Sequence, residues 1–249
     1  MSILTETADG IARIQIARPE RKNAITGAMY TALADALTAA EADASVRVML
    51  LHGQPDIFSA GNDLEDFLRS PPQGADAPVF RFMGVLAGAA KPVVAAVNGA
   101  AVGIGTTLLL HCDLAYCADD SRFSLPFVNL ALCPEFGSSL LLPLSAGYHR
   151  AAEKLMLGEP ASAEEALEMG LVNRALPPAE VLGYARRQCE RLAKLPPNAL
   201  RETKRLLKAG WRAAIERAIS DESAAFARLL VSDEARQAFG AFLERRTPR

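Results

Sequence analysis

Strand and helix patterns alternate along the first half of this chain of 249 residues, and that alternation limits the possible folds more than any other feature. Residues 11–16 alternate apolar and polar side chains, as a half-buried strand does, and residues 26–42 repeat apolar side chains at helical spacing. A helix is also expected at 106–111. Apolar or β-branched runs predict three further, buried strands at 46–52, 93–97 and 113–118. The pattern predicts the α/β fold class.

The last third of the chain has a different, mainly helical pattern. Ser162 and Glu165 have the spacing of a capping box, which predicts a short helix ending at Gly170, followed by a strand-like stretch at 171–175. Four more helices are expected, at 181–195, 199–208, 212–230 and 233–245. Since no Gly/Ser linker or repeat divides the chain, we place a boundary near residue 195, between a core of residues 1–195 and a helical region of residues 196–249.

Composition excludes several kinds of partner. Twenty-seven Lys and Arg residues nearly balance 29 Asp and Glu residues, so nothing draws the whole protein to nucleic acid or to a membrane. The first ten residues lack the pattern of a secretory or mitochondrial leader, and a cytoplasmic location is expected. Four cysteines without a Cys-x-x-Cys pair, and only three histidines, predict reduced thiols and no metal site.

Two glycine-bearing turns stand at the ends of predicted strands. They are Ser59-Ala60-Gly61-Asn62-Asp63-Leu64 and Asn98-Gly99-Ala100-Ala101-Val102-Gly103-Ile104-Gly105. Glycines allow main-chain N–H groups to approach a substrate oxygen closely, so the two turns could supply two convergent donors to an oxyanion. In the simpler structural interpretation, Gly61 relieves loop strain, Asp63 caps a helix at 64–69, and the second turn packs a helix start against a strand. A dinucleotide site is disfavoured because Leu108 stands where its fingerprint needs a third glycine.

One carboxylate lies downstream in apolar surroundings. Glu135 belongs to Pro134-Glu135-Phe136-Gly137-Ser138-Ser139, with leucines on both sides of that segment. A carboxylate in such surroundings is either paired or holds its proton more tightly than in water. The alternatives are a solvated loop acid and an acid in the first turn of a helix at 138–144.

At these residues the chain resembles the crotonase superfamily, which comprises enoyl-CoA hydratases and isomerases. Besides the two turns, the segments 18–24, 91–99, 112–114 and 166–173 match family signatures in the expected order. The resemblance implies a crotonase-like core of repeated strand–strand–helix turns, a C-terminal helical subdomain used in trimerisation, and activity in fatty acid metabolism such as β-oxidation. It also implies an acyl-CoA thioester as substrate, with its carbonyl between two backbone N–H groups, and no separate cofactor.

The resemblance also assigns roles to individual residues. The oxyanion donors would be the N–H groups of Asn62 and Ile104. Ala60 falls where the family binds the CoA adenine, and Arg21 and Lys22 fall in a loop that commonly meets CoA phosphates. The other candidates for CoA or substrate binding are Ala24, Ser59, Gly61, Asp63 and Gly103.

The chain departs from the hydratases at both of their catalytic glutamates, because Thr107 and Phe127 stand at those positions. It is more similar to the peroxisomal-type 3-enoyl-CoA (Δ3,Δ2) isomerases, in which a glutamate follows a proline and precedes a Ser-Ser pair. Glu135 occupies that place and would serve as the single acid/base. A hydratase, another crotonase-type acyl-CoA lyase and a catalytically silent acyl-CoA-binding protein remain alternatives.

Two expectations concern parts of the chain outside these motifs. Residues 70–77 are expected to form a mobile loop near the acyl pocket. Apolar side chains of the helical region are expected to pack between the subunits of a homotrimer or hexamer, or else against their own subunit. They are Ile215, Ile219, Phe226, Leu229, Leu230, Phe239, Phe242 and Leu243.

Overall fold

A computed structural model describes residues 2–72, 74 and 76–246, with side chains as far as residue 241. Its larger sheet has six strands, and all neighbouring strands in it are parallel except the first pair. In spatial order they are β1 (Ile3–Ala8), β2 (Ile11–Ile16), β3 (Val48–His52), β5 (Val93–Val97), β7 (Leu114–Ala118) and β10 (Arg174–Leu176). The strands expected at 11–16, 46–52, 93–97 and 113–118 are confirmed. The strand expected at 171–175 is shorter than expected, beginning at Arg174 and ending at Leu176.

A second, smaller sheet is built from very short strands. In spatial order they are β4 (Ile57–Ser59), β6 (Ala100–Val102), β8 (Arg122–Ser124) and β9 (Ala161–Ser162). The first three are parallel to one another, and each directly follows a long strand of the six-stranded sheet. Helices come after them: α2 (Leu64–Arg69) and α3 (Pro78–Gly88), then α4 (Ile104–Thr107) with the 3₁₀ turn η2 (Leu108–His111), then η3 (Val128–Leu130) with α5 (Ser138–Ala146). The expected repeat of strand, strand and helix is confirmed.

Helices cover both faces of the six-stranded sheet. Val48 and Leu50 point to one face, where they join a cluster with Val181 of α8 (Val181–Ala193). Met49 and Leu51 point to the other and join the main core with α1 (Gly27–Ala42) and α3. Because both faces are buried, β3 is apolar at almost every position.

Local sequence signals set where several helices begin. The Thr26 hydroxyl accepts a hydrogen bond from the Met29 N–H at the start of α1. Ser162 and Glu165 form the expected capping box of α7 (Ala163–Glu168). The Asp63 carboxylate accepts from the Asp66 N–H at the start of α2, as in the simpler interpretation of that turn. The expected helix at 106–111 begins two residues earlier, at Ile104.

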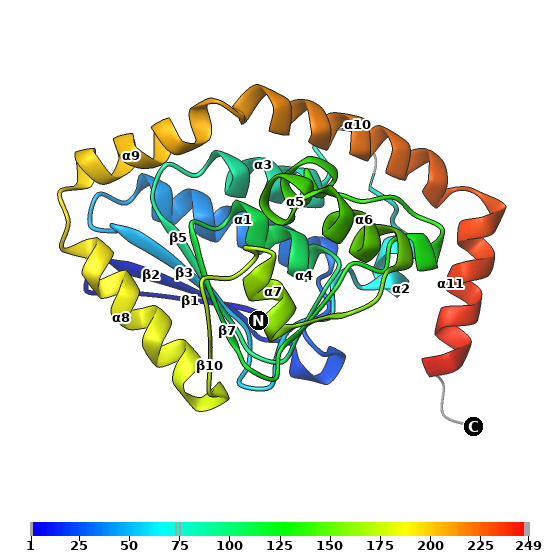
Figure 1. The fold of residues 1–249 in the computed structure, drawn as a ribbon, viewed down its shortest axis with the longest axis horizontal. Coiled ribbons are helices and arrows are strands. Elements are labelled where there is room, and N and C mark those ends of the chain that lie inside the picture. The colour runs from blue at the N-terminus through cyan, green and yellow to red at the C-terminus, as the bar shows by residue number, and fades with distance from the viewer. Residues whose placement is uncertain (1, 73, 75, 247–249) are drawn as a thin grey trace.

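The C-terminal helices form an arch over the core (Figure 1). The arch consists of α9 (Pro197–Ala209) and α10 (Arg212–Leu230), which pass above α3, α5 and α6 (Tyr148–Leu157) before α11 (Asp233–Arg246) turns downward. Helix α10 contacts α5, and α11 contacts η3. No helix among the described residues is long and apolar enough to cross a membrane.

Several of the apolar C-terminal side chains are buried against their own chain. Phe226, Leu230 and Phe239 share a cluster with Leu125 and Phe127. Ile219 packs against the main core, and Leu229 packs against the same cluster as Phe226. The side chains of Phe242 and Leu243 lie outside the described residues, as do residues 73 and 75 of the expected loop at 70–77.

Candidate active site

The two glycine turns touch each other at the carboxyl ends of β4 and β6. A Cβ atom added to Gly61 would lie 2.7 Å from the Val102 carbonyl oxygen, and one added to Gly105 would lie 3.0 Å from the Ser59 carbonyl oxygen. Gly61 also has φ of +85°. Any larger side chain at Gly61 would therefore push the turns apart. The glycines fix the approach of the two turns.

The amides of these turns fall into two groups. The N–H of Ala60 donates to the Lys22 carbonyl, that of Asp63 to the Ile25 carbonyl, and that of Gly103 to the Ser124 carbonyl. By contrast, the N–H groups of Asn62 and Ile104 donate to no described residue. Ile104 is buried and Asn62 half-buried, and because buried amides are almost always paired, two free donors side by side are candidates for binding a ligand. They are the two that the sequence predicted.

A mainly apolar hollow of about 330 Å³ opens beside the turns. Five of the predicted site residues line it: Ala24, Ala60, Gly61, Asn62 and Gly103. The rest of its lining is mainly apolar and comes from α2, the segment around η3, α10 and α11, with Phe67, Phe127, Leu132, Phe226 and Phe239. The hollow thus combines backbone groups of the turns with an apolar wall.

Glu135 is buried, with only 6% of its surface exposed, and neither it nor Ile104 lines the hollow; Glu135 is linked to the hollow through the Asn62 side chain. Its Oε1 atom has no hydrogen-bond partner among the described residues. Burial, and after it the nearby Glu222 carboxylate, raise the pKa of this carboxyl to about 8, although a hydrogen bond from the Asn62 side chain opposes the shift. A carboxyl with such a pKa can both take and return a proton near neutral pH.

Tyr30, on α1, fixes the Asn62 side chain. The Tyr30 hydroxyl donates to Asn62 Oδ1, which leaves the amide nitrogen of Asn62 to face Glu135. Burial, and then the charge of Glu135, raise the pKa of Tyr30 well above its ordinary value, so the phenol stays protonated as a donor. Asn62 thus lies between the hollow and the carboxyl.

The turn after Glu135 is strained and is tied down at several points. Phe136 is left-handed at φ 58°, a costly conformation for a bulky residue. His111 stacks on the Phe136 ring with 3.8 Å between centroids, and its Nε2 lies 2.7 Å from the Phe136 carbonyl. Burial lowers the pKa of His111 to about 4, so the neutral ring donates this bond. The Ser138 hydroxyl donates to the Glu135 carbonyl at 2.7 Å.

Three functional candidates play structural roles here. The Ser59 hydroxyl donates to the Asn23 carbonyl and accepts from the Gly61 N–H. Asp63 pairs with Arg18 at 2.7 Å, and although burial raises its pKa, the bonds from Arg18 and Asp66 bring the net value below normal. Arg21 pairs with Glu65 at 2.9 Å. Ser59 and Asp63 shape the turn from behind it, and neither lines the hollow.

Lys22 and the two positions of the hydratase glutamates have different surroundings. Lys22 is exposed and left-handed, at φ 51°. At the two positions of the hydratase glutamates, Thr107 is fully buried with an unpartnered hydroxyl, and Phe127 lines the hollow. Sequence reasoning missed Tyr30, His111 and Glu222, which approach Glu135 from distant parts of the chain and carry no local motif.

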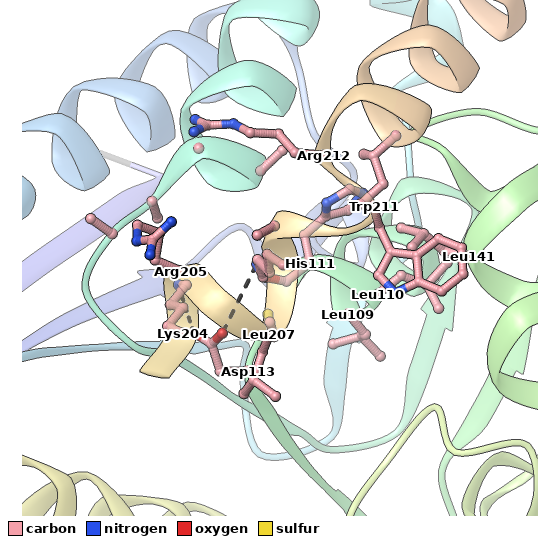
Figure 2. Close-up of a pocket in the computed structure, with 18 of the residues that line it drawn as sticks. Leu109, Leu110, His111, Asp113, Leu141, Lys204, Arg205, Leu207, Trp211 and Arg212 are labelled. Carbon is pink, nitrogen blue, oxygen red and sulfur yellow. Dashed lines mark hydrogen bonds and ion pairs between the residues drawn. The ribbon is translucent and has the colours of Figure 1, made fainter. Parts of the chain in front are cut away.

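A larger hollow of about 1240 Å³ lies beneath the arch, and none of the predicted site residues lines it. Figure 2 shows its charged side chains beside Trp211 and Leu141. Lys204 is bonded to Asp113 at 2.7 Å, and Arg205 is paired with Glu202. These charges are neutralised inside the chain, so the smaller hollow remains the candidate active site.

Comparison with known proteins shows the family to which the chain belongs. A family model described as Enoyl-CoA hydratase/isomerase matches residues 6–249. The chain belongs to the enoyl-CoA hydratase/isomerase family. Two solved structures superpose on the chain with TM-scores of 0.95. OdaA from Pseudomonas aeruginosa is 49% identical, with 97% of this chain and 98% of that one covered. An enoyl-CoA hydratase/isomerase from Pseudoalteromonas atlantica is 36% identical, with 100% and 99% covered. The crotonase-like fold is thereby confirmed.

Curated relatives in the family include enzymes of both kinds. Human enoyl-CoA delta isomerase 2 is 35% identical over 99% of this chain, and the match spans 64% of the human protein. The 2,3-dehydroadipyl-CoA hydratase of Escherichia coli is 30% identical over 93% of this chain and 91% of that protein. The similarity to 3-enoyl-CoA isomerases is thus confirmed, while family membership alone does not separate isomerase from hydratase.

Proposed function

We propose that this protein is a 3-enoyl-CoA isomerase that moves a C3=C4 double bond to C2=C3. The observation that carries the proposal is the single buried carboxyl of Glu135, whose pKa is raised to about 8, beside two unpaired amides. A double-bond shift needs one group that takes a proton and returns it. The positions of both hydratase glutamates hold Thr107 and Phe127, which offer no base to activate water.

The proposed reaction begins with binding of the thioester carbonyl between the N–H groups of Asn62 and Ile104. The Glu135 carboxylate removes a proton from C2, and the electrons move into a dienolate whose oxygen the two N–H groups stabilise. Protonated Glu135 then returns the proton to C4, which completes the shift and restores the carboxylate. Each amide donor is expected to lower the barrier by about 3 kcal/mol, and the positioned base to accelerate the reaction by about 100- to 10,000-fold.

The proposed substrate is an acyl-CoA, and its reaction moves only a proton, so the mechanism calls for no redox group. The apolar wall of the hollow suits an acyl chain and keeps water from the dienolate. For the CoA part, we propose contacts at Ala60 and at the loop of Arg21 and Lys22. Lys22 forms no ion pair with a described residue, and its exposed ammonium supports a phosphate contact.

Two incubations separate the candidate functions. Purified protein is given a 3-enoyl-CoA in one reaction and a 2-enoyl-CoA in the other, and the absorbance of the conjugated thioester is followed. Appearance of conjugation from the first substrate is the expected result. Hydration of the second without conjugation of the first would identify a hydratase, and binding without either reaction would identify a silent acyl-CoA-binding protein.

We also propose a homotrimer or hexamer located in the cytoplasm. Exposed apolar side chains on and near the arch support an assembly, among them Leu207 at 75% and Trp211 at 48% exposure. The four free cysteines support a reducing compartment. Light scattering should give about three or six times the 26.6 kDa chain mass, and a fully active monomer at micromolar concentration would contradict the assembly.

A further inference from the structure

We propose that Glu222, on the arch helix α10, is a positioning residue that holds the turn carrying Glu135 and places a second carboxylate beside it. The proposal rests on the proposed role of Glu135 as the base. It links the C-terminal arch to the chemistry through one side chain.

The contacts of Glu222 are specific and buried. Its Oε2 accepts a hydrogen bond from the Gly137 N–H at 2.5 Å, and its Oε1 accepts from the Ser139 N–H at 2.8 Å. Only 6% of the residue is exposed. The Cys133 thiol donates to the Glu222 carbonyl at 3.7 Å, so α10 holds the catalytic segment on both sides of Glu135.

The setting on α10 explains why a carboxylate is tolerated there. Ile215, Ile219, Glu222 and Phe226 follow one another at helical spacing along the face that meets the core. A Cβ atom on Gly137 would lie 3.5 Å from Ile219 Cγ1. Both oxygens of Glu222 are therefore enclosed among apolar groups and satisfied by the two amides, an arrangement that offsets the cost of burying the charge.

These bonds add to the contacts of His111 and Ser138 that stabilise the strained turn. Gly137 is the N-cap residue of α5 and, having no side chain, cannot cap that helix. Phe136 adds the cost of its left-handed backbone. Glu222 supplies the missing cap from a distant helix, and so fixes the backbone from which the Glu135 side chain projects.

The second effect is electrostatic. Burial raises the pKa of Glu222, and the bonds from Ser139 and Gly137 oppose that shift. Because each oxygen accepts an N–H, the ionised form is the one that satisfies both amides. Its negative charge then disfavours a second charge on Glu135 and raises the pKa of that carboxyl beyond the effect of burial. The other groups that face Glu135 are the Tyr30 phenol from α1, the Asn62 amide, and the Cys133 thiol of its own segment. Within the described part of the chain, no lysine or arginine forms an ion pair with either carboxyl.

Helix α10 of the arch also lines the hollow. The packing of α10 against the core therefore affects both the hollow and the position of the catalytic base. Phe226 lies one helical turn after Glu222 and lines the hollow. Movement of α10 away from the core would open the apolar wall and release the Glu135 turn together.

Two variants test the charge of Glu222 and the length of its side chain. Glu222→Gln keeps the size but removes the charge, whereas Glu222→Asp keeps the charge and withdraws it by one methylene. Glu216→Gln is the matched control, since Glu216 lies on the same helix, is 70% exposed and pairs with Arg212. The readouts are the pKa of the Glu135 carboxyl, from infrared difference titration with Glu135→Gln as the assignment reference, and the kcat of isomerisation.

We expect Glu222→Gln to lower the pKa of Glu135 by about half a unit or more and to reduce kcat about tenfold with KM nearly unchanged. Glu222→Asp should keep that pKa raised but still reduce kcat, and Glu216→Gln should alter neither. An unchanged Glu135 pKa and kcat in a folded Glu222→Gln protein would overturn the proposal. If that variant does not fold, a Glu222→Asp protein with normal kcat would overturn it. Failure of the proposed function appears separately, as unchanged isomerisation by Glu135→Gln or as no isomerisation by the unmodified protein.

Discussion

Two buried polar clusters of this protein differ in how completely their atoms are bonded. Beneath the arch, Lys204 Nζ donates to Asp113 Oδ2 and to the Lys91 carbonyl, each at 2.7 Å. Asp113 Oδ2 also accepts from the Val93 N–H, and Lys91 Nζ donates to two carbonyls, of Ala40 and Asp43. Beside the small hollow, Glu135 Oε1 and the Thr107 hydroxyl have no partner among the described residues, nor do the amides of Asn62 and Ile104.

The difference separates groups that stabilise the fold from groups held ready for a ligand. A buried polar atom without a partner costs about 1–3 kcal/mol of stability, so a cluster with four such atoms weakens the fold unless a ligand uses them. The saturated Lys204 cluster has nothing left to offer a substrate. The unsaturated Glu135 cluster matches the thioester oxygen and the mobile proton of the proposed reaction.

The largest expected effect comes from removing the base of the unsaturated cluster. Glu135→Gln keeps the side-chain volume and should lower isomerase turnover by at least about 100-fold. Binding of acyl-CoA and the circular dichroism spectrum should change little, because the amide fits the same space. Turnover close to that of the unmodified protein would remove Glu135 from the mechanism.

The pH dependence of turnover tests the raised pKa of Glu135. Burial, followed by the Glu222 charge, raises the pKa of Glu135 to about 8, and the reaction must start from its carboxylate form. Below that pKa the active fraction falls about tenfold for each pH unit, so kcat/KM should rise with pH and level off near 8. A profile already flat from pH 5 upward would mean that the carboxyl titrates near its ordinary value.

Removing a partner from the fully bonded Lys204 cluster should lower stability and leave turnover nearly unchanged, the opposite of the result expected for Glu135→Gln. Lys204→Met removes one partner of a buried ion pair and should cost about 3 kcal/mol of unfolding free energy, while kcat of the folded protein stays nearly unchanged. Chemical denaturation followed by fluorescence measures the first quantity, and initial rates measure the second. Arg205→Met is the control, since Arg205 is exposed on the same helix and pairs with Glu202, and its substitution should barely alter the melting temperature. Loss of turnover without loss of stability in Lys204→Met would show that this cluster takes part in the chemistry.

The sequence predicts the parts of the fold that depend on neighbours along the chain. The strand β5 and the helix α10 have the expected bounds because buried strands and amphipathic helices leave a pattern in consecutive residues. The strands β4, β6 and β8 have three residues each, too few for any periodicity. In α3, apolar side chains occupy most of the helix surface, as in Val79-Phe80 and Phe82-Met83, and hide the helical spacing.

The candidate site also contains residues that the sequence predicts and residues that only the fold brings together. Asn62, Ile104 and Glu135 belong to short glycine- or proline-bearing motifs that can be found in one sequence. Tyr30 is 32 residues from its partner Asn62, and Glu222 is 85 residues from Gly137. Only the folded chain brings such residues together. No local sequence pattern predicts the left-handed backbone of Phe136, because that conformation depends on the hydrogen bonds that hold the turn.

The smallest expected effect concerns the other unpartnered side chain, Thr107. Its hydroxyl is fully buried at the position of a hydratase glutamate, yet a threonine cannot serve as a base at neutral pH. Thr107→Ala should therefore keep isomerisation within about tenfold of the unmodified protein, because it removes at most one supporting hydrogen bond. Thr107→Val, which keeps the branched shape, should be closer still and melt at a slightly higher temperature, since it removes an unsatisfied polar atom. If both variants lost as much turnover as Glu135→Gln, Thr107 would have to take part in the proton transfer. The proposed roles of the other unpaired atoms near Glu135 would then be wrong as well.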